Sequence, residues 1–289
     1  MTNDSAYLLK QVKLKSALPT GRFDDDEILE VADDVVLSQV VPLIISLREE
    51  FFVTSEDQAI TANQKAYPVP YRAMGLSLRE VKKVVGSTIV DMDRMSPEEI
   101  TTTQTGNPNK FYLESMDVIL YPTPSATRDS LRLSYYKTPS KLKTVSDCGL
   151  ITAIDTGTGV VTANCPTTWT TGDSFDFVSK RNGHRNHSTD LSCSSVSTTS
   201  ITFAAADLPS ALVVGDYVTL AGESPFVQLP DACFDLVVRL TVNDLLESMG
   251  DQAGLQAGLA RTNTLQQTVV SLLTNRVAGA LKKSIIKSI

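Results

Sequence analysis

The spacing of apolar residues changes several times along the chain. Residues 1–20 show no sustained period, and we expect an arm or loop there. From 28 to 47 apolar side chains recur at helical spacing, after a run of carboxylates at 24–27 that favours the start of a helix. Pro42 lies inside this pattern. Because proline lacks the backbone N–H that a helix interior needs, we expect a kink near Ser38.

From Phe51 onwards the period changes to two, which is typical of β-strands. The expected strands are 51–54, 65–69, 78–85, 111–113, 117–121 and 131–136. These runs are bracketed by prolines, which suit the edge strands and turns of an antiparallel sheet: Pro68, Pro70, Pro122, Pro124 and Pro139.

Residues 145–225 have a different composition, rich in Ser, Thr and short β-branched runs. Residues 172–178 are echoed at 215–220, and each copy follows a strand-like run, so a repeated strand unit is indicated. The turn at 155–159 joins the two strands of a hairpin. We expect a small barrel or sandwich of about six strands, with these aromatic residues buried: Phe175, Phe177, Phe203 and Tyr217.

The helical period returns after Leu229-Pro230-Asp231 and is interrupted at Gly250. The first helix is expected to bury one stripe, formed by Phe234, Val238, Thr241, Leu245 and Met249. A second helical run contains Leu255, Leu259, Leu265, Val269, Leu272 and Leu273 and is expected to continue to Arg276.

These patterns predict an α+β protein: a helical bundle with an antiparallel β-sheet, plus an inserted small all-β barrel or sandwich domain. The predicted division is an N-terminal arm at 1–20, a helix and sheet core at 21–144 and 226–280, an inserted β-domain at 145–225 and a basic apolar tail at 281–289.

Composition narrows the function. The chain has 289 residues and a net charge of −7, which disfavours a free-standing nucleic-acid binder. The first residues contain no apolar core of a secretory signal, and the apolar stretch 35–47 is too short to span a bilayer, so we expect synthesis in a cytoplasm and no membrane span. The four cysteines form no CxxC pair and are expected to be reduced, buried thiols: Cys148, Cys165, Cys193 and Cys233.

No set of residues suggests catalysis. His184 and His187 are the only histidines and lie in a polar stretch at 180–190, which we expect to be a solvated loop and not a zinc site. The acidic run at 24–26 is better explained as a helix cap than as a calcium site. Gly157-x-Gly159 is a hairpin turn, because the third glycine and the helix of a dinucleotide site are missing. We therefore predict no enzyme activity, no metal and no cofactor.

The C-terminal residues combine basic and apolar side chains. Ile285 and Ile289 fall on one helical face, so an ordered tail would present an apolar stripe flanked by positive charge. We expect this stripe to bind a protein groove with an acidic rim; a frayed tail, or weak contact with a membrane or DNA, are the alternatives. The predicted interface consists of Leu281, Lys282, Lys283, Ile285, Ile286, Lys287 and Ile289.

The order of these parts resembles the head-to-tail adaptor, or connector, proteins of tailed bacteriophages. The resemblance rests on the acid-capped helix, on the sheet segments 119–124 and 131–140, and on Leu229-Pro230-Asp231 at the start of a long helix. It covers residues 20–144 and 226–289, while 145–225 depart from the compact form of that family.

The resemblance implies a virion structural protein at the head-tail interface. It implies a ring, typically of twelve copies, docked under the portal protein with the tail or nozzle protein below, and with DNA passing only in transit. In that family the C-terminal segment commonly reaches the portal, which here would be residues 281–289. The inserted domain would contact capsid, tail fibres or neighbouring subunits.

A second function remains open at this point. The Ser/Thr-rich β-domain is also compatible with a glycan-binding or receptor-binding module of a virion protein, and a glycan array would distinguish the two.

Overall fold

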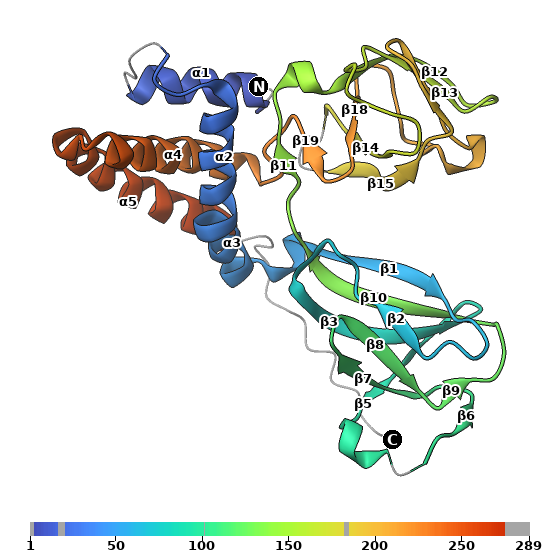
Figure 1. The fold of residues 1–289 in the computed structure, drawn as a ribbon. Helices are drawn as coiled ribbons and strands as arrows, with labels where there is room; N and C mark the ends of the chain where they lie inside the picture. Colours follow the sequence, from blue (N-terminus) through green and yellow to red (C-terminus); the bar gives the residue numbers. More distant parts are fainter. Residues whose placement is uncertain (1–2, 17–20, 101, 182–184, 275–289) are drawn as a thin grey trace, which may run out of the picture. The chain divides into compact units, whose positions relative to one another are not determined.

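The computed structural model describes residues 3–16, 21–100, 102–181 and 185–274 (Figure 1). The chain separates into two compact units. The first combines Met1–Arg48 with Pro139–Ile289, and the second is Glu49–Thr138. Helices and mostly antiparallel sheets are both present, so the predicted α+β class is confirmed. The division into domains predicted from the sequence stays a prediction.

The first unit contains five α-helices in the part of the chain that the structure describes: α1 (Ser5–Ser16), α2 (Asp25–Val35), α3 (Val41–Leu47), α4 (Phe234–Met249) and α5 (Gln252–Thr274). The expectation of an arm or loop is wrong for Ser5–Ser16. Leu8 and Val12 are fully buried there. The other residues of α1 are mostly polar, so the helical spacing of its apolar residues is not recognisable in the sequence. The helix is stabilised by tertiary packing, as most short helices are.

The start of α2 follows the prediction. Asp24 is the N-cap: its carboxylate accepts the Glu27 backbone N–H at 2.8 Å, and the Glu27 side chain accepts the Asp24 N–H at 2.9 Å. The expected irregularity near Ser38 is a π-helical segment, η1 (Val36–Val40). The Val41 N–H bonds to the Val36 carbonyl, so the turn widens immediately before Pro42, which has no N–H to give.

Helices α4 and α5 pack closely together. Gly250 ends α4 in the left-handed conformation at φ 76°, which reverses the chain. A side chain at Gly258 would overlap the amide of Asn243 on α4, so glycine permits the close approach. Asn243 Nδ2 donates to Thr262 Oγ1 across this contact at 2.9 Å.

The buried stripe predicted for the first of these helices is confirmed at Phe234, Val238, Thr241 and Leu245. The second helical run is confirmed as α5, although only some of its apolar residues are buried. Val269 and Leu273 are buried, but Leu259 and Leu272 are 48% and 57% exposed. The face of α5 that contacts α4 is formed by the small residues Gly258 and Thr262, which lie where α4 is closest.

The β-part of the first unit is a seven-stranded sheet in the order β15-β14-β18-β12-β13-β17-β16. Its strands are β12 (Gly149–Asp155), β13 (Val160–Ala163), β14 (Ser174–Val178), β15 (Asn186–Ser192), β16 (Ser195–Val196), β17 (Ser200–Thr202) and β18 (Tyr217–Leu220). β12 pairs with β18 through its first residues and with β13 from Ile151 onwards. The sheet does not close into a barrel over the residues described.

The two echoed segments become β14 and β18, which pair antiparallel. Phe175, Phe177 and Phe203 pack in one core with Trp169, as expected. Tyr217 is buried in a separate cluster with Phe226, because neighbouring strand residues point to opposite faces.

The second unit consists mainly of two four-stranded sheets. One has the order β1 (Val53–Ala59), β10 (Ser130–Lys137), β3 (Ala73–Val85), β4 (Thr88–Asp91). The other has the order β2 (Ala66–Pro68), β8 (Asp117–Tyr121), β7 (Lys110–Glu114), β5 (Asp93–Arg94). Two short strands, β6 (Thr105–Gly106) and β9 (Thr123–Pro124), pair in parallel. Both larger sheets contribute to one core, which includes Tyr67, Val81, Val118 and Leu133.

Candidate functional site

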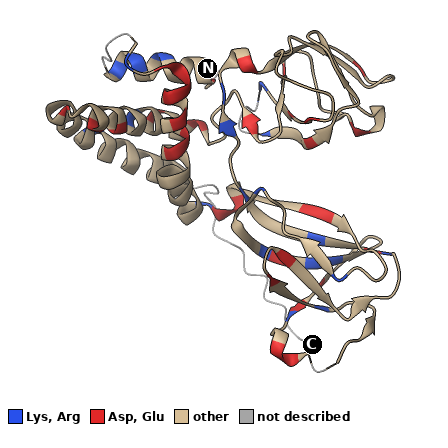
Figure 2. Ribbon diagram, viewed as in Figure 1, with Lys and Arg blue, Asp and Glu red and all other residues tan. Residues whose placement is uncertain are grey.

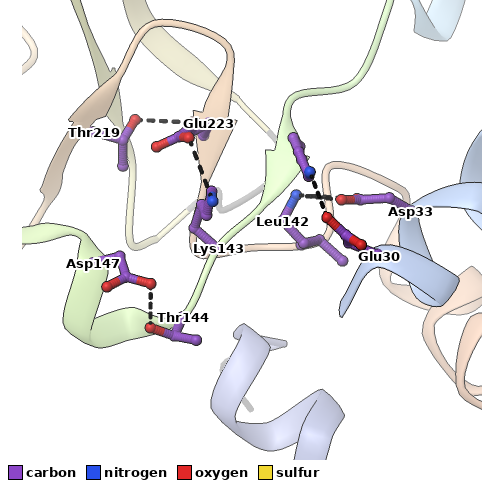
Figure 3. A network of polar contacts seen from close by, with 9 residues as sticks. Glu30, Asp33, Leu142, Lys143, Thr144, Asp147, Thr219 and Glu223 are labelled. Atoms are coloured by element: carbon purple, nitrogen blue, oxygen red, sulfur yellow. Dashed lines mark hydrogen bonds and ion pairs between the residues drawn. The ribbon is translucent and has the colours of Figure 1, made fainter. Parts of the chain in front are cut away.

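A polar cluster that contains a carboxyl group with a strongly raised pKa lies where the chain passes into and out of the β-part (Figure 3). The incoming strand β11 (Lys141–Leu142) and the outgoing strand β19 (Glu223–Ser224) pair in parallel. Backbone bonds from Lys141 N to Gly222 O at 2.8 Å and from Lys143 N to Ser224 O at 3.0 Å hold them. We call this cluster the junction; its residues are Glu30, Asp33, Lys141, Leu142, Lys143 and Glu223.

Asp33 joins the junction to α2. Both of its carboxylate oxygens accept the Leu142 backbone N–H, each at 3.0 Å. Burial raises the pKa of Asp33 to about 7, against the lowering effects of the Leu142 N–H and the charge of Lys141. The junction therefore contains a carboxyl group that titrates near neutral pH.

The other charges of the junction surround this carboxyl group. Lys141 Nζ lies 3.1 Å from Glu30 Oε1, and Lys143 Nζ lies 3.8 Å from Glu223 Oε1. Burial also raises the pKa of Glu223, and Lys143 opposes that shift. Thr219 Oγ1 donates to the Glu223 carbonyl at 2.8 Å and fixes the outgoing strand.

The beginning of α1 is attached to the same place. The Ser5 N–H donates to the Pro225 carbonyl at 2.7 Å, and Asp4 forms a β-bridge with Phe226. Beside it, an open groove runs between α1 and the 3-10 turn η4 (Val145–Asp147), lined by Leu9, Lys10, Leu14 and Val145 among others. These contacts fix the chain before and after the β-part to the helices.

Two carboxylates are fully buried inside the β-part. Asp216 Oδ1 accepts the Lys180 backbone N–H at 2.9 Å, and its Oδ2 accepts the Val213 N–H at 3.0 Å and lies 3.0 Å from His187 Nε2. Asp176 accepts from the Asp190 and Gly222 N–H groups and from the Asn186 side chain. Every one of these contacts stabilises the fold.

The expectation of a solvated loop at 180–190 is therefore wrong from Asn186 onwards. That segment forms β15, and its His187 side chain is only 16% exposed beside Asp216. The strand is not recognisable in the sequence because its residues are mostly polar. At this edge of the β-part the partly buried side chains are polar groups that form hydrogen bonds. His184 lies outside the described residues.

The thiols offer little reactivity. All four cysteines are free and buried, as predicted. Burial raises the pKa of Cys165 to about 11 and that of Cys233 to about 12, so the nucleophilic thiolate is disfavoured there. Across the described ranges, no three His, Cys, Asp or Glu side chains gather in a way that could hold a metal ion. Nor is any helix in these ranges long and apolar enough to span a membrane.

The interface predicted from the sequence cannot be compared with these places. Leu281, Lys282, Lys283, Ile285, Ile286, Lys287 and Ile289 all lie outside the described residues, so their role stays a prediction. Sequence reasoning missed the junction, since Asp33 and Leu142 are distant in the chain and a short segment such as Lys141–Leu142 has no strand period.

A glycan-binding role for the β-part also stays a prediction. The aromatic residues of 145–225, which would stack on sugar rings, are all buried: Trp169, Phe175, Phe177, Phe203 and Tyr217.

The comparison with protein families shows the class of the protein: the family model described as SU10 adaptor protein matches residues 16–170. Since the match covers more than half of the chain, the protein belongs to this family of bacteriophage head-to-tail adaptors, which are structural proteins of the virion. No curated protein sequence matches the chain.

The extent of the match refines the resemblance noted in the sequence. It includes α2, α3, the whole second unit and the first hairpin of the β-part, β12 and β13. Helices α4 and α5 lie beyond it, although they pack on α1, α2 and α3 in the structure.

Proposed function

We propose that the protein forms a ring, of twelve copies, which joins the portal at the capsid vertex to the tail or nozzle and surrounds the channel through which DNA passes. The observation that carries this proposal is membership of the adaptor family over residues 16–170. The ring, its copy number and its neighbours are parts of the proposal.

The charge of the chain supports a channel that does not hold DNA. Each copy has a net charge of −7, so a ring of twelve would carry on the order of −84 and would repel the phosphate backbone. We expect assembled rings to retain no duplex DNA at low salt. Retention that weakens steeply with added salt would contradict this part of the proposal.

The contact with the portal is proposed to lie in the C-terminal tail. Residues 281–289 place Lys282, Lys283 and Lys287 among isoleucines and a leucine, a composition suited to an apolar groove with an acidic rim. A chain that ends at Ala280 keeps every residue of the described helices, and circular dichroism checks that it is folded.

The experiment mixes the purified full chain with the portal ring of its own phage and measures binding by sedimentation and negative-stain microscopy. We expect rings on the portal with the full chain and loss of binding when the chain ends at Ala280. A matched pair of variants then separates the contributions of the tail. Ile285→Asp with Ile289→Asp should abolish binding, whereas Lys282→Gln with Lys283→Gln should weaken it and make it less sensitive to salt.

Failure of the full chain to bind the portal would overturn the proposed attachment. Full binding by the chain ending at Ala280 would leave the ring proposal intact but would remove the tail from it.

A further inference from the structure

Two groups of like charge, each partly exposed, lie on different sides of α4, and neither forms an ion pair among the described residues. The basic patch consists of Arg239 on α4 with Arg261 and Leu272 on α5. The acidic patch consists of Asp34 on α2 and Leu37 on η1, with Asp244 and Glu247 on α4. Figure 2 shows acidic positions along α2 and few basic positions on α4 and α5.

The basic patch is positioned by the contact between α4 and α5. Asn243 bonds to Thr262, and Arg239 lies one turn before Asn243 while Arg261 is next to Thr262. The two guanidinium groups are thus brought near each other; burial, and then the charge of Arg261, lower the pKa of Arg239. Among the described residues, neither arginine has an ion pair or side-chain hydrogen bond.

An exposed leucine extends the basic patch. Leu272 lies about three turns beyond Arg261 on the same side of α5 and is 57% exposed. Arg48 bonds to the backbone carbonyls at the end of α5, at Leu272 and Leu273, and holds this last turn in place. The patch is therefore a fixed surface with both apolar and positive character.

The acidic patch likewise combines charged groups, here negative, with one exposed leucine. Burial raises the pKa of Asp244, and the charges of Glu247 and Asp34 raise it further, so three carboxylates repel one another here. Leu37 follows Asp34 by three positions, on the same face, and is 44% exposed. In the part of the chain that the structure describes, no Lys or Arg forms an ion pair with these three carboxylates.

No ion pair joins the two patches among the residues described. Arg239 and Asp244 point about 140° apart around α4, one toward α5 and the other toward α2. Each copy therefore carries a positive and a negative surface that face in different directions. This is the arrangement that a head-to-tail interface requires, in which two different surfaces meet and the contact repeats around a ring.

We propose that the basic patch of one copy binds the acidic patch of the next copy, so that Arg239 and Arg261 neutralise Asp34, Asp244 and Glu247 across the subunit boundary, with Leu272 and Leu37 in the same contact. The inference rests on the proposed ring. A symmetric contact between two basic or two acidic patches is disfavoured because like charges repel. DNA is a poorer partner for the arginines, since duplex binding needs many phosphate contacts and the chain is acidic.

The test uses charge reversal in the full chain, with assembly on the portal ring measured by mass photometry and negative stain. Variant one carries Arg239→Glu and Arg261→Glu; variant two carries Asp244→Arg and Glu247→Arg. Each alone should require at least about tenfold more protein to assemble than the natural sequence, because like charges then meet at every boundary. Mixed in equal amounts they should assemble again, because each boundary then joins opposite charges.

Two controls make the outcome specific. Arg94→Glu with Arg128→Glu changes the net charge by the same amount on the second unit and should assemble normally. Trp169 fluorescence and far-ultraviolet circular dichroism check that every variant is folded.

The possible failures are distinguishable. If the natural chain does not form rings with the portal, the proposed function fails. If it does, and both reversed variants also assemble, or the mixture of folded variants does not recover, this assignment of the interface is wrong.

Discussion

The carboxylates of the β-part and those of the helices differ in burial, hydrogen bonding and pKa. In the β-part, Asp176 and Asp216 are fully buried, and each receives several hydrogen bonds from backbone and side chains. Around α2 and α4, Asp33 and Asp244 are partly buried and have pKa values raised mainly by burial. The first group accepts several hydrogen bonds, whereas Asp33 accepts only the Leu142 N–H and the Asp244 carboxylate accepts none among the described residues.

This difference in hydrogen bonding distinguishes carboxylates that stabilise the fold from carboxylates that are available to bind a partner. A buried carboxylate with complete hydrogen bonding has no capacity left for another molecule. A partly exposed group with a raised pKa gains stability when an opposite charge arrives. Binding surfaces are therefore to be sought on the helices and not around Asp176 or Asp216.

The largest effect is expected at Asp216. Asp216→Ala leaves the Lys180 and Val213 N–H groups and His187 without their acceptor, and should destabilise the β-part by about 3 to 5 kcal/mol. Trp169, the one tryptophan of the chain, is buried in that core and reports its unfolding in urea. Asp216→Asn, which keeps one acceptor oxygen, should lose less. Equal stability of the alanine variant would show that these bonds do not hold the β-part together.

A smaller effect is expected at Gly258, which tests whether the basic patch depends on close helix packing. Gly258→Ala should destabilise the helices by about 1 to 3 kcal/mol, because its methyl group overlaps the Asn243 amide and outweighs the better helix propensity of alanine.

The matched control for that prediction is Gly254→Ala, four residues earlier in α5. Its methyl group meets only the exposed side chain of Asp251, whose Oδ1 accepts the Gly254 N–H at 3.0 Å, so the loss should stay below about 1 kcal/mol even if this capping bond is weakened. Adding Asn243→Ala to Gly258→Ala should recover part of the loss in thermal unfolding followed by circular dichroism; no recovery would place the strain elsewhere.

The next effect concerns pH. Asp33 has a pKa of about 7 in the folded protein against 3.8 ordinarily, so the folded state binds the extra proton between these values. Its contribution to stability is complete below about pH 4 and is lost as the pH rises through 7. Asp33→Asn, which keeps an acceptor for the Leu142 N–H, should therefore remove on the order of 1 to 2 kcal/mol of the fall in stability between pH 5 and pH 8.

Urea unfolding of both proteins at pH 5 and pH 8, followed by circular dichroism, checks this prediction. Burial also raises the pKa of Glu223, so a smaller slope of the same sign should persist in the Asp33→Asn variant. An identical slope in both proteins would mean that Asp33 is ionised throughout this range.

Much of the fold could be predicted from local patterns. The cap at Asp24, the irregularity before Pro42 and the alternation around Leu131 each depend on neighbours in the sequence, and the structure confirms them. The echo of 172–178 at 215–220 likewise became two paired strands. Such features can be predicted because the residues that stabilise them are close together in the sequence.

The junction and the two charged patches could not be predicted in this way. Asp33 meets Leu142, and Asp34 lies near Asp244, only after the chain has folded over long separations. The exposed position of Leu272 was missed for a related reason, since Gly258 and Thr262 take the buried side of α5 and leave that leucine to solvent.

The smallest effect is expected at Lys141, and it isolates the contribution of Asp33 from that of the lysine beside it. The Lys141 and Glu30 side chains are 51% and 65% exposed, so water and salt screen their ion pair at 3.1 Å. Lys141→Ala should change stability by no more than about 0.5 kcal/mol in urea unfolding at pH 8. It should also raise the pKa of Asp33 slightly, because one of the charges that lowers that pKa is removed. A loss as large as that expected at Gly258 would show that the lysine, and not the Leu142 backbone bond to Asp33, holds the junction together.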